Sequence, residues 1–354
     1  MMVRILELMK GRLVKYQAEN RALIPVTGFT VLLLLTSVSS ITSENTREDV
    51  RIMFYNVENL FDTIDCDLDD DEFLPSALRR WNTYRYYRKL NNISKVIVAA
   101  GSWKPPDIIG LCEVENSTVI SDLLSGTMLG RVDYRHIYAP SADERGIGVC
   151  LVYNSRFELL SKELLYPVYP GGDTLSTRSV LFCVLANRTD TLGVVVTHWP
   201  SRRGGVSSTE RLRKIVSQHI KEDILDTEKE MKIIIMGDFN CEPGSDLIKN
   251  LLIPSRSTEN ITGCFNPSAA SGGSYKYQGM WYQYDQFILK NNLLDSKKGY
   301  SYSENSFSVI MHDFMLSSDV TFRGLKPFST YAGPRYLGGY SDHLPIVIDL
   351  VAGD

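Results

Sequence analysis

The stretch IIIMGDFNCEP, residues 233–243, joins an apolar strand-like run to a polar turn. Ile233–Met236 has the uninterrupted apolar character of a buried strand, and Gly237 allows the backbone to turn tightly at its end. Asp238 and Asn240 are two residues apart, so their side chains point the same way in extended geometry. A carboxylate can orient or deprotonate water while a neutral amide holds a phosphate oxygen. The stretch therefore predicts a strand that ends in a catalytic site.

Five further apolar runs end in polar clusters of the same kind. They read MFYNVEN (53–59), IIGLCEVEN (108–116), VVVTHWPSRRGG (194–205), YDQFIL (284–289) and YSDHLPIVIDL (340–350). Oxygen ligands and two histidines, with no cysteine among them, suit a hard cation such as Mg²⁺ better than zinc. Strand ends that converge on one cation predict metal-assisted hydrolysis of a phosphate ester. The residues that carry this prediction are Asn56, Glu113, His198, Asp238, Asn240, Asp285, Asp342 and His343.

Two further glutamates are alternative candidates for the metal site. Glu58 and Glu115 each lie two residues after a candidate, Asn56 and Glu113 respectively. Either glutamate fits a role at the metal, and either fits an ordinary loop carboxylate, so both interpretations stay open.

The 354 residues are 44% hydrophobic and 23% charged, which is ordinary globular composition. The polar clusters run from Asn56 to His343, so a single site needs nearly the whole chain and favours one domain. The formal net charge is −4. An acidic protein lacks the broad basic surface of a tight, nonspecific binder of duplex DNA.

The N-terminal segment differs from the rest of the chain. Residues 1–21 carry five basic and two acidic side chains, whereas residues 22–43 carry no charge and end in small side chains. This pattern predicts a cleaved export signal, with an uncleaved membrane anchor as the alternative, because 22 uncharged residues nearly span a bilayer. We expect a domain over residues 44–354 and an exported protein, periplasmic or extracellular. Contact with a membrane is expected only if residues 22–43 are not cleaved off.

Apolar periodicity predicts strands interleaved with helices on both sides, and hence sheets covered by helices. Residues 263–282, rich in Gly, Ser and Tyr, predict a long loop. Helices are expected at 77–100, 117–128 (with Ser117 as its cap) and 207–230. Strands are expected at 50–55, 107–112, 134–138, 147–153, 179–186, 192–197, 232–236, 284–289 and 346–350, with a further segment near 307–316.

Residues 62–72 are strongly acidic. Asp65, Asp67 and Asp69 match the start of an EF-hand calcium loop, but position six is Asp70 rather than Gly and position twelve is Ser76 rather than Glu. We interpret the segment as a solvated acidic loop.

The six cysteines show no C-x-x-C pair. Cys112, Cys150 and Cys183 lie inside apolar runs, where a free cysteine behaves as a small buried hydrophobe. A disulfide is possible if the protein is exported, but the spacing favours no particular pair.

Taken in this order, the polar clusters resemble those of the endonuclease/exonuclease/phosphatase superfamily, over about residues 51–350. The resemblance implies a DNase I-like four-layer α/β sandwich: two mixed β-sheets packed face to face, flanking helices, and a site at one end. It also implies a metal-dependent phosphoesterase with Mg²⁺ as cofactor, Mn²⁺ and Ca²⁺ being the alternatives. One or two metal ions fit the resemblance.

Roles follow from the resemblance residue by residue. Glu113 resembles the main metal ligand with Asn56 beside it, and Asp342 a further ligand of metal or water. Asp238 resembles the carboxylate that activates the attacking water, and Asn240 its neighbour on the phosphate. His198 resembles the histidine at the scissile phosphate or leaving oxygen. Asp285 resembles the aspartate that orients the final histidine, His343, which contacts a phosphoryl oxygen.

Three arginines are candidates for holding the substrate phosphate. Arg202 and Arg203 follow His198 in a Gly-containing loop, and Arg145 precedes the run GIGVCLVY. Guanidinium groups match phosphate geometry, and an exposed basic loop is the alternative interpretation.

We therefore expect a hydrolase in which water attacks in line without a covalent intermediate. A phosphodiesterase or nuclease acting on a nucleic acid or nucleotide leads, and the chain is expected to be a monomer. The enzymatic alternatives are a phosphatase on inositol phosphates and a sphingomyelinase-like lipid phosphodiesterase. A binding module that has lost catalysis is the alternative from another class, and the full set of site residues argues against it.

Overall fold

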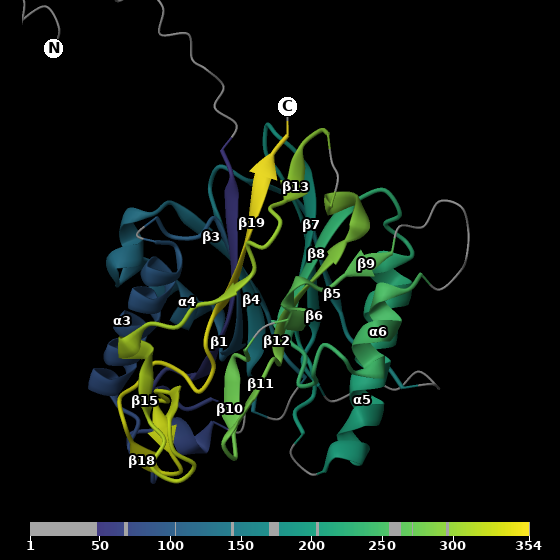
Figure 1. Cartoon of the computed structure of the whole chain (residues 1–354). Helices are drawn as coiled ribbons and strands as arrows, with labels where there is room; N and C mark the ends of the chain where they lie inside the picture. The colour runs from purple at the N-terminus through teal and green to yellow at the C-terminus, as the bar shows by residue number, and fades with distance from the viewer. Residues whose placement is uncertain are drawn as a thin grey trace, which may run out of the picture. The chain divides into compact units, whose positions relative to one another are not determined.

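Two β-sheets form the centre of the fold (Figure 1). The computed structural model describes residues 48–66, 70–102, 104–142, 145–169, 177–202, 205–254, 263–270, 272–294 and 297–353. The first sheet has the order β13 (Tyr300–Tyr302), β19 (Ile346–Ala352), β1 (Val50–Leu60), β2 (Ile108–Val114), β4 (Gly148–Asn154) and β3 (Tyr134–Ala139), with β14 (Ser308–Val309) also paired to β19. The second has the order β5 (Glu158–Leu165), β6 (Val180–Ala186), β7 (Thr191–His198), β8 (Lys232–Asp238), β12 (Asp285–Lys290) and β9 (Cys264–Phe265).

Both sheets are mixed. β1 pairs with β2 in parallel and with β19 antiparallel, while β7 and β8 are parallel neighbours. The carboxyl ends of parallel strands meet at one edge of a sheet, which brings the polar ends of these strands together. The predicted sheet architecture is therefore confirmed in its strand directions.

The face between the sheets is apolar from both sides. Ile52 and Phe54 of β1 pack in one cluster with Val194 of β7, Met236 of β8 and Phe287 of β12. The alternate residues of β1, such as Met53, face the helices instead. Complete burial of an aliphatic side chain contributes roughly 1.5–3 kcal/mol. Strands that are apolar on both faces therefore favour a sandwich with outer helices over a sheet open to solvent on one side.

Helices cover the two outer faces, as Figure 1 shows. α3 (Thr83–Ala100) and α4 (Ser117–Ser125) pack on the first sheet. α5 (Val206–His219) and α6 (Asp246–Leu252) pack on the second. Together with the two sheets they make four layers, so the predicted DNase I-like α/β sandwich is confirmed. None of the helices in the described residues has the length and apolarity required to span a bilayer.

The predicted helix boundaries need correction. α3 begins at Thr83 rather than at residue 77, because the Asn82 side chain accepts a hydrogen bond from the Arg85 amide and caps the helix. Asn116, not Ser117, caps α4, accepting from the amides of Thr118 and Val119. The third helix ends early: α5 passes into a π-helical turn at Ile220–Leu225.

The predicted long loop at 263–282 is wrong. It contains β9 and a hairpin of β10 (Tyr275–Tyr277) and β11 (Met280–Tyr282), and β5 was not predicted at all. Two further hairpins pair β15 (Leu316–Ser318) with β16 (Leu325–Pro327) and β17 (Tyr331–Ala332) with β18 (Arg335–Tyr336). Short 3-10 turns lie at Asp71–Phe73, Met128–Arg131, Pro267–Ala270, Asn291–Leu293 and Asp313–Met315.

Cys112, Cys150 and Cys183 are buried, as predicted from their apolar neighbours. The predicted signal or anchor, residues 1–43, lies outside the described residues and stays a prediction.

A buried lysine ties α3 to the segment before Ser341. Lys89 is 1% exposed, and its Nζ donates to Thr330 Oγ1 (2.5 Å) and the Tyr340 carbonyl (2.7 Å). The same Nζ lies 3.8 Å from Glu58 Oε2. Glu58 in turn accepts from the Thr330 amide at 2.6 Å. Burial raises the pKa of Glu58 to about 7, against the opposing charge of Lys89.

Lys89→Met is expected to destabilise the fold by about 3 kcal/mol, because it leaves the buried Glu58 without its cation. Urea unfolding measures this loss. The double variant Lys89→Met, Glu58→Gln removes the uncompensated carboxylate and is expected to recover part of the stability. Equal unfolding midpoints for Lys89→Met and the unmodified protein would contradict the role of this pair.

Candidate active site

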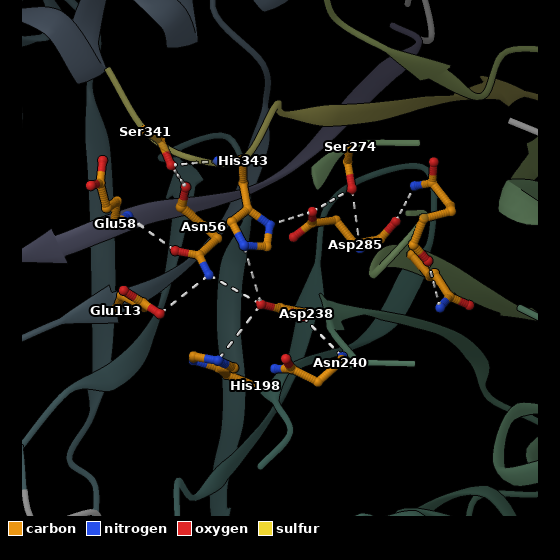
Figure 2. A network of polar contacts seen from close by, with 12 residues as sticks. Asn56, Glu58, Glu113, His198, Asp238, Asn240, Ser274, Asp285, Ser341 and His343 are labelled. Carbon is orange, nitrogen blue, oxygen red and sulfur yellow. Dashed lines mark hydrogen bonds and ion pairs between the residues drawn. The ribbon is translucent and has the colours of Figure 1, made fainter. Parts of the chain in front are cut away.

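The polar clusters that follow the central strands meet at one end of the sandwich (Figure 2). His198 and Asp238 are register partners at the ends of the parallel strands β7 and β8. Asp285 begins β12 opposite Asp238, and Asn56 lies on β1 across the interface between the sheets. The structure thus brings together residues that are as much as 287 positions apart in the chain, from Asn56 to His343.

Irregular backbone aims Glu113 into this end of the sandwich. The register between β1 and β2 shifts after Asn56, where Glu58 and Asn59 have φ of 54° and 50°. Glu113 itself has φ of 63°, a left-handed conformation that non-glycine residues rarely adopt. Its Oε2 accepts from the Asn59 amide at 2.9 Å, and its Oε1 lies 3.5 Å from Asn56 Nδ2. Such strain persists where the surrounding structure enforces it, and it is common at functional sites.

Asp238 is the centre of the network. It is 2% exposed, and its Oδ2 accepts from Asn56 Nδ2 at 3.1 Å. The same oxygen lies 3.7 Å from the Nε2 atoms of both His198 and His343. Its Oδ1 accepts from the Asn240 amide at 2.9 Å. Burial raises the pKa of Asp238 to about 6, against the opposing charge of His343.

His343 is held by a buried carboxylate. Its Nδ1 lies 2.7 Å from Asp285 Oδ2, which also accepts from Ser274 Oγ. Its ring stacks on Tyr275 with centroids 4.6 Å apart. Burial would lower the pKa of His343, but the charges of Asp285 and Asp238 outweigh it and raise that pKa well above its usual value. The two carboxylates therefore favour the cationic form of this imidazole, whose Nε2 faces Asp238.

His198 has the opposite character. It is 3% exposed, and its Nδ1 has no hydrogen-bond partner within the described residues. Burial, together with the charges of Arg178 and Arg145, lowers its pKa well below the usual value. The sequence leaves open which imidazole is charged, and this geometry favours a neutral His198 beside a cationic His343.

Two carboxylates at the site lack a cation. No ion pair among the described residues involves Glu113 or Asp342, which is half-buried. Burial raises the pKa of Asp342, and the nearby Glu113 charge adds to this rise, against His343. Two neighbouring carboxylates without a counterion, beside the Asn56 amide, fit a divalent cation with oxygen ligands. The metal expected from the sequence thus has suitable residues at Glu113, Asn56 and Asp342.

A second group of atoms has the spacing of a metal site. Ligand atoms of Asp238, Asp285 and His343 lie within 4.8 Å of one another. Here Asp285 is already hydrogen-bonded to His343, whose positive charge opposes a metal ion. We therefore interpret this group as the proton-handling part of the site.

The three arginines that were candidates for holding the substrate phosphate lie in different surroundings. Arg202 Nη1 donates to the Tyr284 hydroxyl at 2.7 Å, close to the β12 end of the site. Arg145 Nη1 lies 3.5 Å from Asn59 Oδ1 and its charge reaches His198. Arg203 lies outside the described residues. Asn240, which has φ of 49°, donates one Nδ2 hydrogen to the Trp199 carbonyl and has a second for a ligand.

Sequence reasoning missed several supporting residues. Ser274 and Tyr275 hold Asp285 and His343 from a segment that the sequence predicts as a loop. Ser341 Oγ donates to the Asn56 carbonyl at 2.7 Å and accepts from the His343 amide, which joins the last cluster to the first. Arg178 was also missed. It precedes β6 as Arg145 precedes β4, and this repeated position in the sequence would have indicated it as a candidate.

Comparisons with known proteins identify the family of this chain. A sequence model described as the Endonuclease/Exonuclease/phosphatase family matches residues 51–352. No curated protein matches the chain.

Several solved structures share the fold. An endonuclease/exonuclease/phosphatase from Bacteroides vulgatus is 16% identical with a TM-score of 0.54, over 86% of this chain and 100% of that chain. The human Nocturnin catalytic domain with bound sulfate is 18% identical, with a TM-score of 0.51 over 86% and 94%. A mannosyl-6-phosphatase from Bacteroides thetaiotaomicron is 13% identical, with a TM-score of 0.54 over 85% and 99%. Because the family match contains every strand end of the site, this chain belongs to the endonuclease/exonuclease/phosphatase family.

Proposed function

We propose that this chain is a divalent-metal-dependent phosphodiesterase that uses water as its nucleophile. The observation that carries the proposal is the position of Asp238, whose Oδ2 lies 3.7 Å from two imidazoles. Glu113 and Asp342, which form no ion pair among the described residues, belong to the same site. Hydrolysis of a phosphate ester needs a proton acceptor, donors for the nonbridging oxygens and compensation of negative charge. The residues of this site supply the first two, and a bound cation supplies the third.

Each side chain has a defined task in the proposed reaction. Asp238 orients a water molecule and accepts its proton as the water oxygen bonds to phosphorus. The bond to the leaving oxygen breaks on the opposite side. His343, held by Asp285, donates from Nε2 to a nonbridging oxygen, and the second Nδ2 hydrogen of Asn240 reaches another. His198 is neutral and donates a hydrogen bond without adding charge.

When bound by Glu113, Asn56 and Asp342, a divalent cation would neutralise negative charge on the phosphoryl oxygens as a Lewis acid. Mg²⁺ suits this set because it binds through one or two carboxylates and keeps several waters. Mn²⁺ and Ca²⁺ are the alternatives.

Aromatic rings beside His343 support a substrate that contains a ring. Tyr275 stacks on His343 and on Tyr284, whose ring also stacks on Tyr282 with centroids 5.2 Å apart. Such rings bind bases or sugars by stacking. A small phosphodiester such as a nucleotide derivative is therefore the leading substrate class. A phosphomonoester is the second candidate, because the mannosyl-6-phosphatase has the same fold.

We expect the purified protein to hydrolyse bis-p-nitrophenyl phosphate with Mg²⁺ and to lose this activity in EDTA. Glu113→Gln is expected to raise the Mg²⁺ concentration for half-maximal activity by at least about 10-fold, because it removes a metal ligand. Glu158→Gln, at an exposed position of the edge strand β5, is the matched control and is expected to behave as the unmodified protein.

The comparison substrate is p-nitrophenyl phosphate. Turnover of this monoester without turnover of the diester would replace the phosphodiesterase proposal by a phosphatase. Activity that persists in EDTA, with an unchanged metal requirement in Glu113→Gln, would contradict the metal-dependent mechanism.

A further inference from the structure

A second group of acidic side chains lies in the segment that follows β1. Ligand atoms of Cys66, Asp70 and Glu115 lie within 4.8 Å of one another, and the same holds for Asp65, Asp70 and Asp71. Asp70 belongs to both groups. None of these residues takes part in the catalytic network around Asp238. The acidic segment therefore has an organisation that the proposed reaction does not explain.

Asp65, Asp71 and Glu72 are exposed, as expected of a solvated acidic loop, but Asp70 is not. It is 2% exposed, and its Oδ1 is buried with no hydrogen-bond partner among the residues that the structure describes. Asp70 occupies the position before the 3-10 turn Asp71–Phe73, yet its side chain makes no capping hydrogen bond there. Only its carbonyl is used, accepting from the Phe73 amide at 2.7 Å. An ionised carboxylate buried in this way is costly unless a cation or a donor accompanies it.

Glu115 completes the buried part of the group. It is 5% exposed, and its Oε2 accepts from the Asp62 amide at 2.7 Å. This hydrogen bond fixes the carboxylate toward the acidic segment and leaves Oε1 for another ligand. The backbone therefore holds one carboxylate of the group in place beside Asp70.

Basic side chains do not neutralise this group. No ion pair among the described residues includes Asp65, Asp70, Asp71 or Glu115. The arginine paired within the same region, Arg79, contacts Glu72 at 2.9 Å instead. A bound cation would supply the positive charge that the basic side chains of the described residues do not.

We propose that Asp70 and Glu115 bind a calcium-class divalent cation at a site separate from the catalytic one, and that Asp65, which shares the second group with Asp70, joins them as a further ligand. Carboxylate oxygens dominate the group, which contains no imidazole and one thiol. Ca²⁺ takes six to eight oxygen ligands in flexible geometry, whereas zinc sites are built from thiolates and imidazoles. Water and the exposed Asp71 can complete the coordination.

The site joins two segments that end at the catalytic edge. Asp65 and Asp70 follow β1, which carries Asn56, and Glu115 lies two residues after Glu113 at the end of β2. A cation at this position holds the two strand ends together. Its role is therefore structural, and it supports the position of Glu113 without contact with substrate.

Isothermal titration with Ca²⁺ tests the proposal on the full chain, with Glu113→Gln as background to weaken binding at the catalytic site. We expect this protein to bind one Ca²⁺. Adding Asp70→Asn is expected to weaken that binding by at least about 10-fold, as loss of a carboxylate ligand does. Adding Glu72→Gln instead, which removes a carboxylate that pairs with Arg79, is the matched control and is expected to leave it unchanged.

Thermal unfolding gives a second readout that does not depend on activity. At a Ca²⁺ concentration 100-fold above Kd, the Tm is expected to rise by about 3 °C or more. Measured in Glu113→Gln, this rise is expected to disappear when Asp70→Asn is added, and the Tm in EDTA is expected to stay no lower than that of Glu113→Gln alone, because Asp70→Asn removes a buried charge.

Three results would overturn the proposal. One is the absence of Ca²⁺ binding in Glu113→Gln, and another is equal binding with and without Asp70→Asn. The third is a preference for Zn²⁺ that Cys66→Ser abolishes, because it would assign the group to a thiolate-bound metal. None of these outcomes depends on whether the catalytic site hydrolyses a phosphodiester.

Discussion

Asp238→Asn is expected to lower kcat by about 10³-fold, because the amide cannot accept the proton of the attacking water. The substitution keeps the shape of the side chain and an oxygen that can accept from the Asn56 amide, which now donates to Asp238 Oδ2 at 3.1 Å. It removes a charge that is 2% exposed, which favours stability, but its single oxygen cannot accept from both Asn56 Nδ2 and the Asn240 amide as Asp238 does, so we expect only a small net change in stability. Steady-state kinetics on bis-p-nitrophenyl phosphate, together with urea unfolding, measures both effects.

The control for this substitution is Asp246→Asn. Asp246 begins α6 and has an exposed side chain, so the substitution is expected to leave kcat and stability unchanged. If Asp238→Asn folds normally and retains kcat within about threefold of the unmodified protein, Asp238 is not the proton acceptor.

His343→Gln is expected to lower kcat by about 10³-fold, because it removes the cationic donor to the phosphoryl oxygen. Asp285→Asn should have a smaller effect on kcat and a distinct effect on pH dependence. The Asp285 carboxylate raises the pKa of His343 through a 2.7 Å contact, and an amide in its place does not.

The sign of this pH effect follows from the form of His343 that acts. If the imidazolium is the donor, activity falls as pH rises through the pKa of His343. Asp285→Asn lowers that pKa, so the loss of activity begins at a lower pH than in the unmodified protein. A profile of kcat against pH measures the shift. An unshifted basic limb in Asp285→Asn would show that Asp285 supports the fold without setting the charge of His343.

Much of the fold could be read from local patterns. Ile233–Met236 is buried and strand-like in the structure, and Asp238 stands at the end of that strand as predicted. A strand that is apolar on both faces is stable only in the interior, because each of its residues would lose the free energy of burial if it were exposed to water. The helices were located, but their first and last residues depend on side-chain caps such as that of Asn82.

The supporting residues of the site could not be read in the same way. Tyr275 and Ser274 come from a segment whose composition is typical of a loop, and the hairpin of β10 and β11 forms against its tertiary surroundings. Short strands carry weak local preferences, so packing decides them. Asp70 is a further example: its acidic neighbours predict solvation, whereas the chain buries its carboxylate beside Glu115.

The sequence by itself determined which polar residues end the central strands, because apolar periodicity and the residues that interrupt it are local properties. Only the tertiary structure decided how these ends share one site. Two sheets packed face to face are required to bring Asn56 Nδ2 within 3.1 Å and His343 Nε2 within 3.7 Å of Asp238 Oδ2. The protonation of the two histidines is likewise a tertiary property, since it depends on burial and on charges from distant strands.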